Sequence, residues 1–231
     1  MKLLKYLLVI PARCGSKGIF LKNITDLNNK PLIHYTLNIA KSLDKENLVD
    51  RIYISTDCIE IAKVCEDEGF KIEKLRSKKN ATDNAKTVDV VLEVLEEYNK
   101  KKILFENVII LQPTSPLRTH KNVKDAINIF NKEECDSLIS VYNDETLSLD
   151  ILYRENIKLL MPIKSDHNSG NQRQKNKKLY VRNGAIYIVK VDYLLKHKKL
   201  ISDNPGYVEM NKVESINIDS QIDLEITKKF I

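Results

Sequence analysis

The sequence predicts an α/β fold, a mainly parallel β-sheet covered by helices on both faces. Short apolar segments alternate with longer amphipathic segments through the first 140 residues. Strict alternation of strand and helix implies right-handed crossovers and parallel strands. The 231 residues are 42% hydrophobic and 30% charged, which is ordinary for a soluble globular protein. We therefore expect one domain over residues 1–231, with no membrane association, since no apolar run approaches the roughly 18 residues of a membrane span.

Six segments have the composition of buried strands. They cover residues 6–11, 51–55, 71–75, 107–112, 137–142 and 184–189. Short apolar runs of this kind are typical of parallel strands that are covered on both faces. The first run follows Lys2 and Lys5, as in a secretion signal, but it is short, and Pro11 and Arg13 stand where a cleavage site needs small residues. A strand is the better interpretation.

Amphipathic helices are predicted between these strands. They cover residues 31–43, from Asp57 to near Gly69, from Thr87 onward, about 122–131, and 220–230. Pro31 suits a first helical position, and Asp57 is a candidate N-cap. Between Asp150 and Tyr180 the alternation gives way to polar sequence rich in lysine and asparagine. A subunit contact, a lid and a surface loop all remain open for this excursion.

The charge pattern argues against a nucleic-acid partner, and the cysteine spacing argues against a CxxC zinc or redox motif. The net charge of +6 comes mostly from basic residues interleaved with acidic ones, and the one basic run, 173–178, has no aromatic residues. A phosphate-rich small ligand explains this surplus as well as nucleic acid would, so no nucleic-acid partner is expected. The four cysteines show no CxxC spacing, and Cys58 and Cys65 would lie about 10 Å apart along a helix. Reduced thiols and a cytoplasmic location are expected.

The strongest chemical signal is the segment IPARCGSKG at residues 10–18, directly after the first strand. Open α/β sheets bind ligands at the carboxyl ends of their strands. Gly15 and Gly18 allow backbone N–H groups to converge on an anion, and Ser16 adds a hydroxyl donor. The cations that could meet a triphosphate are Arg13, Lys17 and Lys22. The segment matches neither Walker A nor GxGxxG, and a surface turn with incidental basic residues is the alternative.

Five further segments agree with one known pattern. They are ISTD at 54–57, QPTSPLR at 112–118, RQ at 173–174, NGAIY at 183–187 and SINID at 215–219. Together with the first loop they span nearly the whole chain, and the sequence resembles the acylneuraminate cytidylyltransferases, the CMP-sialic acid synthetases. The resemblance implies a Rossmann-like nucleotidyltransferase fold, with residues 144–182 as a dimerisation and sugar-site excursion. It implies CTP and an acidic 2-keto-3-deoxy sugar as substrates, Mg²⁺ as cofactor, and a homodimer.

The resemblance also implies roles for individual residues. The phosphates and nucleotide of CTP are assigned to Arg13, Ser16, Lys17, Lys22, Asn23, Arg76 and Thr87. The sugar and the space between the two substrates are assigned to Gln112, Thr114, Ser115, Arg173, Asn183 and Tyr187. Without the resemblance, Arg76 and Arg173 would be solvated arginines and Thr87 a helix N-cap. In this family the region around Arg173 reaches across the dimer interface, so this arginine could serve the neighbouring subunit.

The metal is assigned to Asp219 together with Asn217. Mg²⁺ prefers oxygen ligands and is typically held by one or two carboxylates plus substrate phosphates. The family usually has two aspartates at these positions, so Asn217 leaves the number of metal ions open. The alternative is that Asp219 caps the last helix. Related enzymes also carry a lysine near residues 144–152 that this sequence lacks, which leaves the identity of the sugar open.

The expected reaction is attack of the sugar's anomeric hydroxyl on the α-phosphorus of CTP, with pyrophosphate leaving. Catalysis would rest on in-line positioning and on charge neutralisation by Mg²⁺ on Asp219 and by Arg13 and Lys17. Asp219, a metal-bound hydroxide and Gln112 acting through water all remain candidates for the general base. The alternatives are the same chemistry on legionaminic, pseudaminic or ketodeoxyoctonic acid, and a nucleotide-binding module impaired by Asn217.

Overall fold

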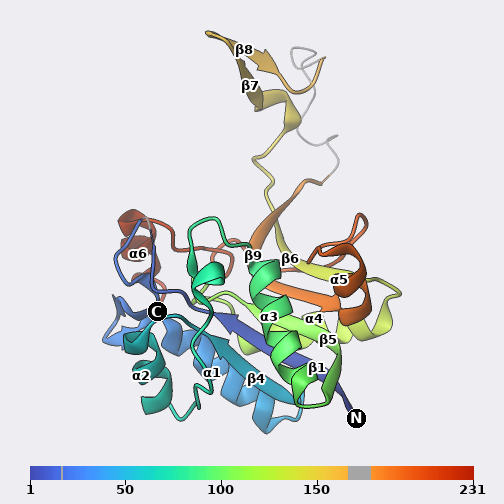
Figure 1. The fold of residues 1–231 in the computed structure, drawn as a ribbon. Helices are drawn as coiled ribbons and strands as arrows, with labels where there is room; N and C mark the ends of the chain where they lie inside the picture. Colours follow the sequence, from blue (N-terminus) through green and yellow to red (C-terminus); the bar gives the residue numbers. More distant parts are fainter. Residues whose placement is uncertain (17, 166–177) are drawn as a thin grey trace.

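A computed structural model describes residues 1–16, 18–165 and 178–231 (Figure 1). Its centre is a six-stranded sheet in the order β10-β6-β9-β5-β1-β4. The strands are β1 (Lys2–Pro11), β4 (Arg51–Ser55), β5 (Ile103–Leu111), β6 (Ser137–Asn143), β9 (Tyr180–Lys190) and β10 (Gly206–Glu209). β1 pairs in parallel with β4 and β5, and β6 pairs in parallel with β10, whereas β9 is antiparallel to both β5 and β6. The predicted mainly parallel sheet is confirmed.

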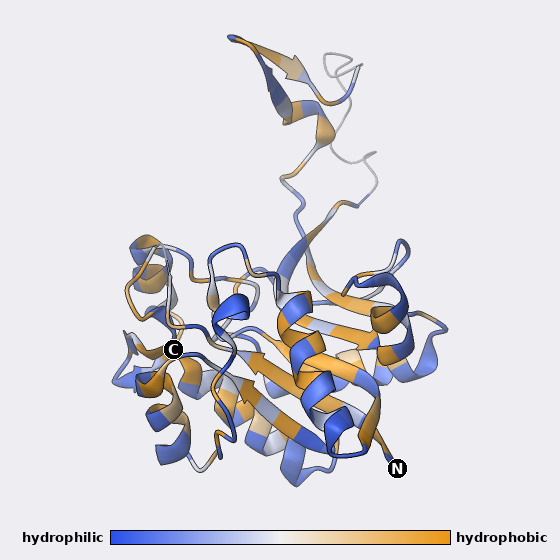
Figure 2. Ribbon diagram, in the orientation of Figure 1, coloured by the Kyte–Doolittle hydropathy of each residue, from blue (hydrophilic) through white to orange (hydrophobic). Residues whose placement is uncertain are grey.

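Helices cover both faces of this sheet. They are α1 (Leu32–Lys45), α2 (Ile59–Asp67), α3 (Thr87–Lys100), α4 (His120–Lys132), α5 (Val191–His197) and α6 (Gln221–Thr227). Alternate side chains of β1 divide between two cores: Leu8 and Ile10 pack with residues of α1, α2 and α4, and Leu7 and Val9 pack with residues of α3 and α5. Figure 2 shows apolar strands inside and hydrophilic outer helix surfaces. This two-sided burial explains why the strand sequences are continuously apolar.

One predicted strand is wrong. Residues 71–75 form no strand, and within them only the Ile72 side chain is partly buried, against the core under α1 and α2. The neighbouring β4 is an edge strand. The segment runs past it, and one backbone hydrogen bond follows at its end, from Arg76 N–H to the carbonyl of Thr56 at 2.7 Å. The segment was predicted as a strand from its composition, but a single partly buried side chain is too little to hold it in the sheet.

The helix boundaries needed smaller corrections. The N-cap of α2 is Cys58 rather than Asp57, because the Asp57 carboxylate instead accepts a hydrogen bond from the backbone N–H of Cys14 at 2.9 Å. α4 begins at His120 after a capping box made by Thr119 and Asn122. The short elements α5 and β10 were not predicted.

Two small structures lie beside the main sheet. β2 (Asp26–Leu27) and β3 (Lys30–Pro31) pair after the first loop, which includes a 3₁₀ turn at Lys22–Ile24. Within residues 144–182 the chain forms a 3₁₀ turn, Leu149–Ile151, and a hairpin of β7 (Tyr153–Asn156) and β8 (Leu159–Pro162). This hairpin projects away from the sheet and its helices (Figure 1). In the described part of the chain, no helix combines the length and apolarity needed to cross a membrane.

Candidate active site

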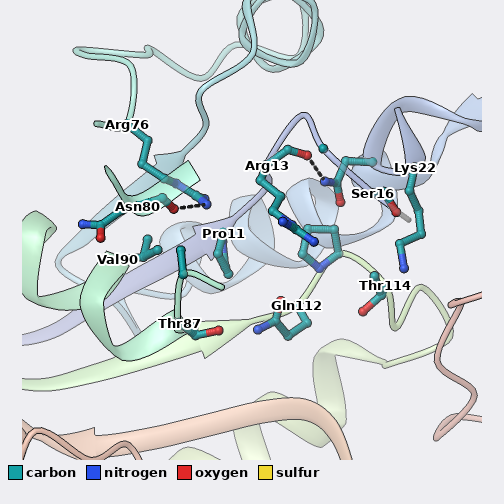
Figure 3. Close-up of a pocket in the computed structure, with 14 residues that line it drawn as sticks. Pro11, Arg13, Ser16, Lys22, Arg76, Asn80, Thr87, Val90, Gln112 and Thr114 are labelled. Atoms are coloured by element: carbon teal, nitrogen blue, oxygen red, sulfur yellow. Dashed lines mark hydrogen bonds between the residues drawn. The ribbon is translucent and has the colours of Figure 1, made fainter. Parts of the chain in front are cut away.

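A pocket of about 180 Å³ lies at the carboxyl ends of β1 and β5 (Figure 3). Its walls come from the loop after β1, the segment before α3, the start of α3 and the loop after β5. The residues that line it are Pro11, Arg13, Gly15, Ser16, Lys22, Asn23, Arg76, Asn80, Ala85, Thr87, Val90, Gln112, Pro113 and Thr114. Eight of the residues predicted for the site therefore meet around one cavity.

The loop after β1 is held in shape by buried polar contacts. The amide of Asn23, which is itself buried, donates to the backbone carbonyl of Arg13 at 2.9 Å. The guanidinium of Arg13 forms an ion pair with Asp83 at 2.7 Å, and both side chains are partly exposed. An exposed pair of this kind contributes little to stability, so a phosphate can replace the aspartate at small cost. Lys17 lies outside the described residues.

The segment 217–219 lies against this loop. Lys22 Nζ donates to the carbonyl of Ile218 at 2.8 Å and to Asp219 Oδ1 at 2.9 Å. The amide of Asn217 donates to Asp219 Oδ2 at 2.6 Å. A Cβ placed on Gly18 would lie 2.1 Å from the carbonyl oxygen of Asp219, so only glycine permits this approach.

Asp219 is therefore one end of a polar chain that leads to the phosphate loop. It does not cap the last helix, since the N-cap of α6 is Ser220, whose hydroxyl accepts from the backbone N–H of Asp223. The N–H of Ile218 bonds the carbonyl of Thr114 at 2.8 Å, which also links this segment to the loop after β5.

Arg76 is buried rather than solvated. Its Nε donates to Ser55 Oγ at 2.9 Å, its Nη2 donates to the carbonyl of Ser55, and its Nη1 reaches the carbonyl of Asn80 at 3.5 Å. Burial lowers the pKa of the guanidinium, and Asp57 and Glu93 oppose that shift. Arg76 thus fastens the end of β4 to the pocket wall at Asn80.

Asn80 was missed by sequence reasoning, and Glu93 holds it in place. The Glu93 carboxylate accepts from the backbone N–H of Ser77 at 2.9 Å, from the Ser77 hydroxyl at 2.7 Å and from the Asn80 amide at 2.5 Å. No local sequence signal identifies Asn80, because its partner Glu93 lies in the next helix along the chain.

Thr87 is the first residue of α3 and not its N-cap, which is Lys86.

The loop after β5 is supported by Arg118, a second residue that was missed. Its guanidinium is fully buried and donates to the carbonyls of Gln112 at 3.0 Å and Ala185 at 2.9 Å and to Thr36 Oγ1 at 2.8 Å. Among the described residues it has no carboxylate in ion-pair range, and burial lowers its pKa to about 9. Gln112 and Thr114 face the pocket, whereas Ser115 is fully buried and outside the lining.

Of the residues predicted for the sugar side, Gln112 and Thr114 line this pocket, whereas Asn183 and Tyr187 do not. The buried amide of Asn183 bonds Ser140 Oγ at 2.5 Å and Ser215 Oγ at 2.8 Å, and so ties β9 to β6 and to the segment before Asn217. Tyr187 is partly buried beside the core under α3, and burial raises its pKa. Arg173 lies outside the described residues. The sugar assignments remain predictions.

Comparison with known proteins decides the family. A family model described as cytidylyltransferase matches residues 7–230. The chain belongs to the cytidylyltransferase family. It is 31% identical to a CMP-N,N'-diacetyllegionaminic acid synthase of Legionella pneumophila over 99% of this chain and 97% of that protein. It is 28% identical to an N-acylneuraminate cytidylyltransferase of Streptococcus agalactiae over 95% of this chain, which corresponds to 52% of that longer protein.

The fold agrees with solved structures of cytidylyltransferases. A CMP:2-keto-3-deoxy-manno-octonic acid synthetase complexed with CTP superposes with a TM-score of 0.71 at 18% identity, covering 98% of both chains. A 4-diphosphocytidyl-2C-methyl-D-erythritol synthase superposes with a TM-score of 0.66 at 12% identity. The predicted family and the Rossmann-like nucleotidyltransferase fold are confirmed.

Proposed function

We propose that this cytidylyltransferase joins CMP from CTP to the anomeric hydroxyl of an acidic nine-carbon 2-keto-3-deoxy sugar, with release of pyrophosphate. The observation that carries the proposal is the pocket at the end of β1, where the phosphate-type loop meets both the 217–219 segment and the loop after β5. Two cations of the loop, Arg13 and Lys22, line this pocket together with the hydroxyl of Ser16. This arrangement suits a triphosphate next to a second substrate.

The chain's own residues would bind and orient the two substrates. Arg13 and Lys22, with Lys17 from the same loop, would neutralise charge that develops on the phosphoryl and leaving oxygens. Asn80 and Thr87 form the opposite wall, where the nucleoside would lie. Gln112 and Thr114 stand on a loop that two prolines and Arg118 keep rigid, so they can position the sugar at little ordering cost.

The residues around Asp219 fit Mg²⁺. The Asp219 carboxylate is 72% exposed, and one of its oxygens already faces a cation, the ammonium of Lys22. A carboxylate and the Asn217 amide oxygen, next to a triphosphate loop, are the hard oxygen donors that Mg²⁺ prefers. When bound, the ion would supply further neutralisation of phosphate charge. Asp219 and Asn217 would hold it, and Lys22 would orient the carboxylate.

A second candidate for the sugar is a legionaminic acid. Relatives named CMP-N,N'-diacetyllegionaminic acid synthase, from Legionella pneumophila and Campylobacter jejuni, are both 31% identical to this chain and match at least 94% of their own length. The sialic-acid relatives of Streptococcus agalactiae are 28% identical and about twice as long. These identities support legionaminic acid as the alternative to sialic acid. Arg173, Asn183 and Tyr187 remain the residues proposed to recognise the sugar.

The β7–β8 hairpin is proposed to contact a second copy of the chain. Its apolar side chains are largely exposed, with Ile157 at 88%, Leu159 at 76% and Leu160 at 69%. An isolated two-stranded hairpin is marginally stable in water, so these side chains need a covering surface. A homodimer would supply that cover, and it would bring the excursion to the partner's pocket. The expected test is light scattering: the wild type runs as a dimer, Leu160→Lys runs as a monomer, and a monomeric wild type contradicts the proposal.

The four cysteines are free and include two buried ones, which suits the reducing cytoplasm where we propose that the reaction takes place.

Pyrophosphate release measured across nucleoside triphosphates and eight- or nine-carbon keto acids tests the function. We expect release only with CTP and an acidic nine-carbon sugar. Arg13→Ala should lower kcat/KM for CTP by about 10²-fold or more. Arg51→Ala is the matched control, because Arg51 is exposed at the start of β4 and, among the residues that the structure describes, its side chain hydrogen-bonds only the Asp50 carbonyl. Near-normal kinetics of Arg13→Ala would contradict the phosphate assignment.

A further inference from the structure

Three potential metal ligands meet beside the pocket but outside its lining. The thiols of Cys14 and Cys58 and the carboxylate of Glu60 lie within 4.8 Å of one another. Cys14 belongs to the loop after β1, and Cys58 is the N-cap of α2. The two cysteines are far apart in the sequence, so the absence of CxxC spacing concealed this cluster.

The contacts within the cluster are specific. Cys58 Sγ donates to Glu60 Oε2 at 3.0 Å and also contacts the Cys14 thiol. Cys58 is 2% exposed, Cys14 is partly buried and Glu60 is exposed. The cluster is therefore anchored at its base by a buried thiol and open to solvent at the carboxylate.

This donor set matches a thiophilic divalent cation. Zinc is bound at about 2.3 Å by thiolate sulfur and at about 2.0–2.2 Å by carboxylate oxygen, so tetrahedral ligand atoms are separated by roughly 3.5–3.8 Å. Side-chain rotations can bring the three atoms from their present separations into that range. Mg²⁺ prefers oxygen ligands and would not select a site with two sulfurs. A zinc-type ion would keep one position open for water.

We propose that Cys14, Cys58 and Glu60 bind a single divalent cation of the zinc class, separate from the Mg²⁺ site proposed at Asp219. Binding replaces both thiol protons, which pass to solvent, and leaves two thiolates and one carboxylate around the ion.

The site would fasten the phosphate-type loop to α2. Cys14 directly follows Arg13, and its backbone N–H already bonds Asp57 at 2.9 Å, one residue before Cys58. A metal would add a second, stronger link between the same two segments, and it would thereby restrain Arg13 at the pocket.

Titration of the full-length protein with Co²⁺, with the cysteine thiols kept reduced by a phosphine, tests the proposal. We expect one equivalent to bind with thiolate-to-cobalt charge transfer and tetrahedral d–d bands, and Zn²⁺ to displace it. Cys14→Ser should remove at least half of the charge-transfer intensity. Glu60→Gln should keep the band while weakening binding about tenfold or more. Cys135→Ser is the control, because Cys135 lies elsewhere, against Gly206, and its loss should leave the band intact.

The result that overturns the proposal is the absence of a charge-transfer band in the wild type, or a band of equal intensity in Cys14→Ser. Cys58 is buried, so Cys58→Ser would risk unfolding the chain. The test therefore uses variants of the exposed Glu60 and the partly buried Cys14 and does not need Cys58→Ser. Zn²⁺ should also raise the thermal midpoint of the wild type and leave that of Cys14→Ser unchanged. Equal stabilisation of both proteins would place the ion elsewhere and contradict the proposal.

Discussion

Gly18 controls how closely the phosphate-type loop approaches Asp219. A Cβ at this position would lie 2.1 Å from the Asp219 carbonyl oxygen, and real Cβ contacts are essentially never shorter than 3.0 Å. Gly18→Ala must therefore push the loop and the 217–219 segment apart by at least 0.9 Å, the difference between those two distances. The atom in the way belongs to the backbone, so no side-chain rotation can relieve the overlap.

The cost of this displacement is expected in both stability and activity. Overpacking of this kind costs about 1–3 kcal/mol of folding free energy. A displacement near 1 Å between groups that act on one substrate can lower the rate by about 10²-fold. Because Lys22 bonds both Ile218 and Asp219, moving the segment also breaks the contact between the cation and the carboxylate.

The assay combines thermal unfolding with kcat/KM for CTP measured by pyrophosphate release. Gly15→Ala is the control for stability, because a Cβ there meets nothing within 4 Å. Its free energy of unfolding should stay the same or rise by about 0.4–1 kcal/mol, since alanine restricts the unfolded chain. Wild-type stability and wild-type kcat/KM in Gly18→Ala would refute the close packing of loop and segment.

Three further outcomes are expected. Arg118→Met removes the buried hydrogen bonds to the carbonyls of Gln112 and Ala185 and to Thr36 Oγ1, and it should lower the free energy of unfolding in urea by about 2 kcal/mol; an unchanged midpoint would contradict its supporting role. Burial raises the pKa of Glu93, but its hydrogen bonds outweigh burial and hold that pKa below the ordinary 4.5. The ionised carboxylate therefore stabilises the fold above pH 4.5, and this stabilisation is lost as the pH falls through the lowered pKa. The difference in thermal stability between wild type and Glu93→Gln should shrink on acidification, and a difference that does not change with pH would contradict the role of the Glu93 carboxylate. Asp219→Ala should lower Mg²⁺-dependent turnover by about 10²-fold or more, and undiminished turnover would remove Asp219 from the metal site.

The sequence was most informative where burial leaves a continuous pattern. β1, β5 and β6 were predictable because strands covered on both faces carry short runs rich in apolar residues. Residues 71–75 misled because two apolar side chains in a short segment do not show whether the segment pairs with a sheet, and here it runs past the edge strand β4 without pairing. The short α5 and β10 were missed because elements of a few residues depend on tertiary packing more than on local propensity.

The same distinction applies to the site. The loop after β1 was predictable because its glycines and cations are consecutive in the sequence. Asn80, Arg118 and the Cys14–Cys58 cluster were not predictable, because each depends on contacts between segments that only the fold brings together. The burial of Arg76 likewise follows from its contact with the end of β4, which local composition does not encode.

The most direct test of the proposed chemistry uses an acidic nine-carbon sugar labelled with ¹⁸O at the anomeric hydroxyl. If that hydroxyl attacks the α-phosphorus of CTP, the label ends in the bridging oxygen of the CMP-sugar, and the pyrophosphate carries none. Mass spectrometry and ³¹P NMR distinguish these positions. A CMP-sugar without the label, labelled pyrophosphate, or unconsumed CTP with every sugar tested would contradict the account.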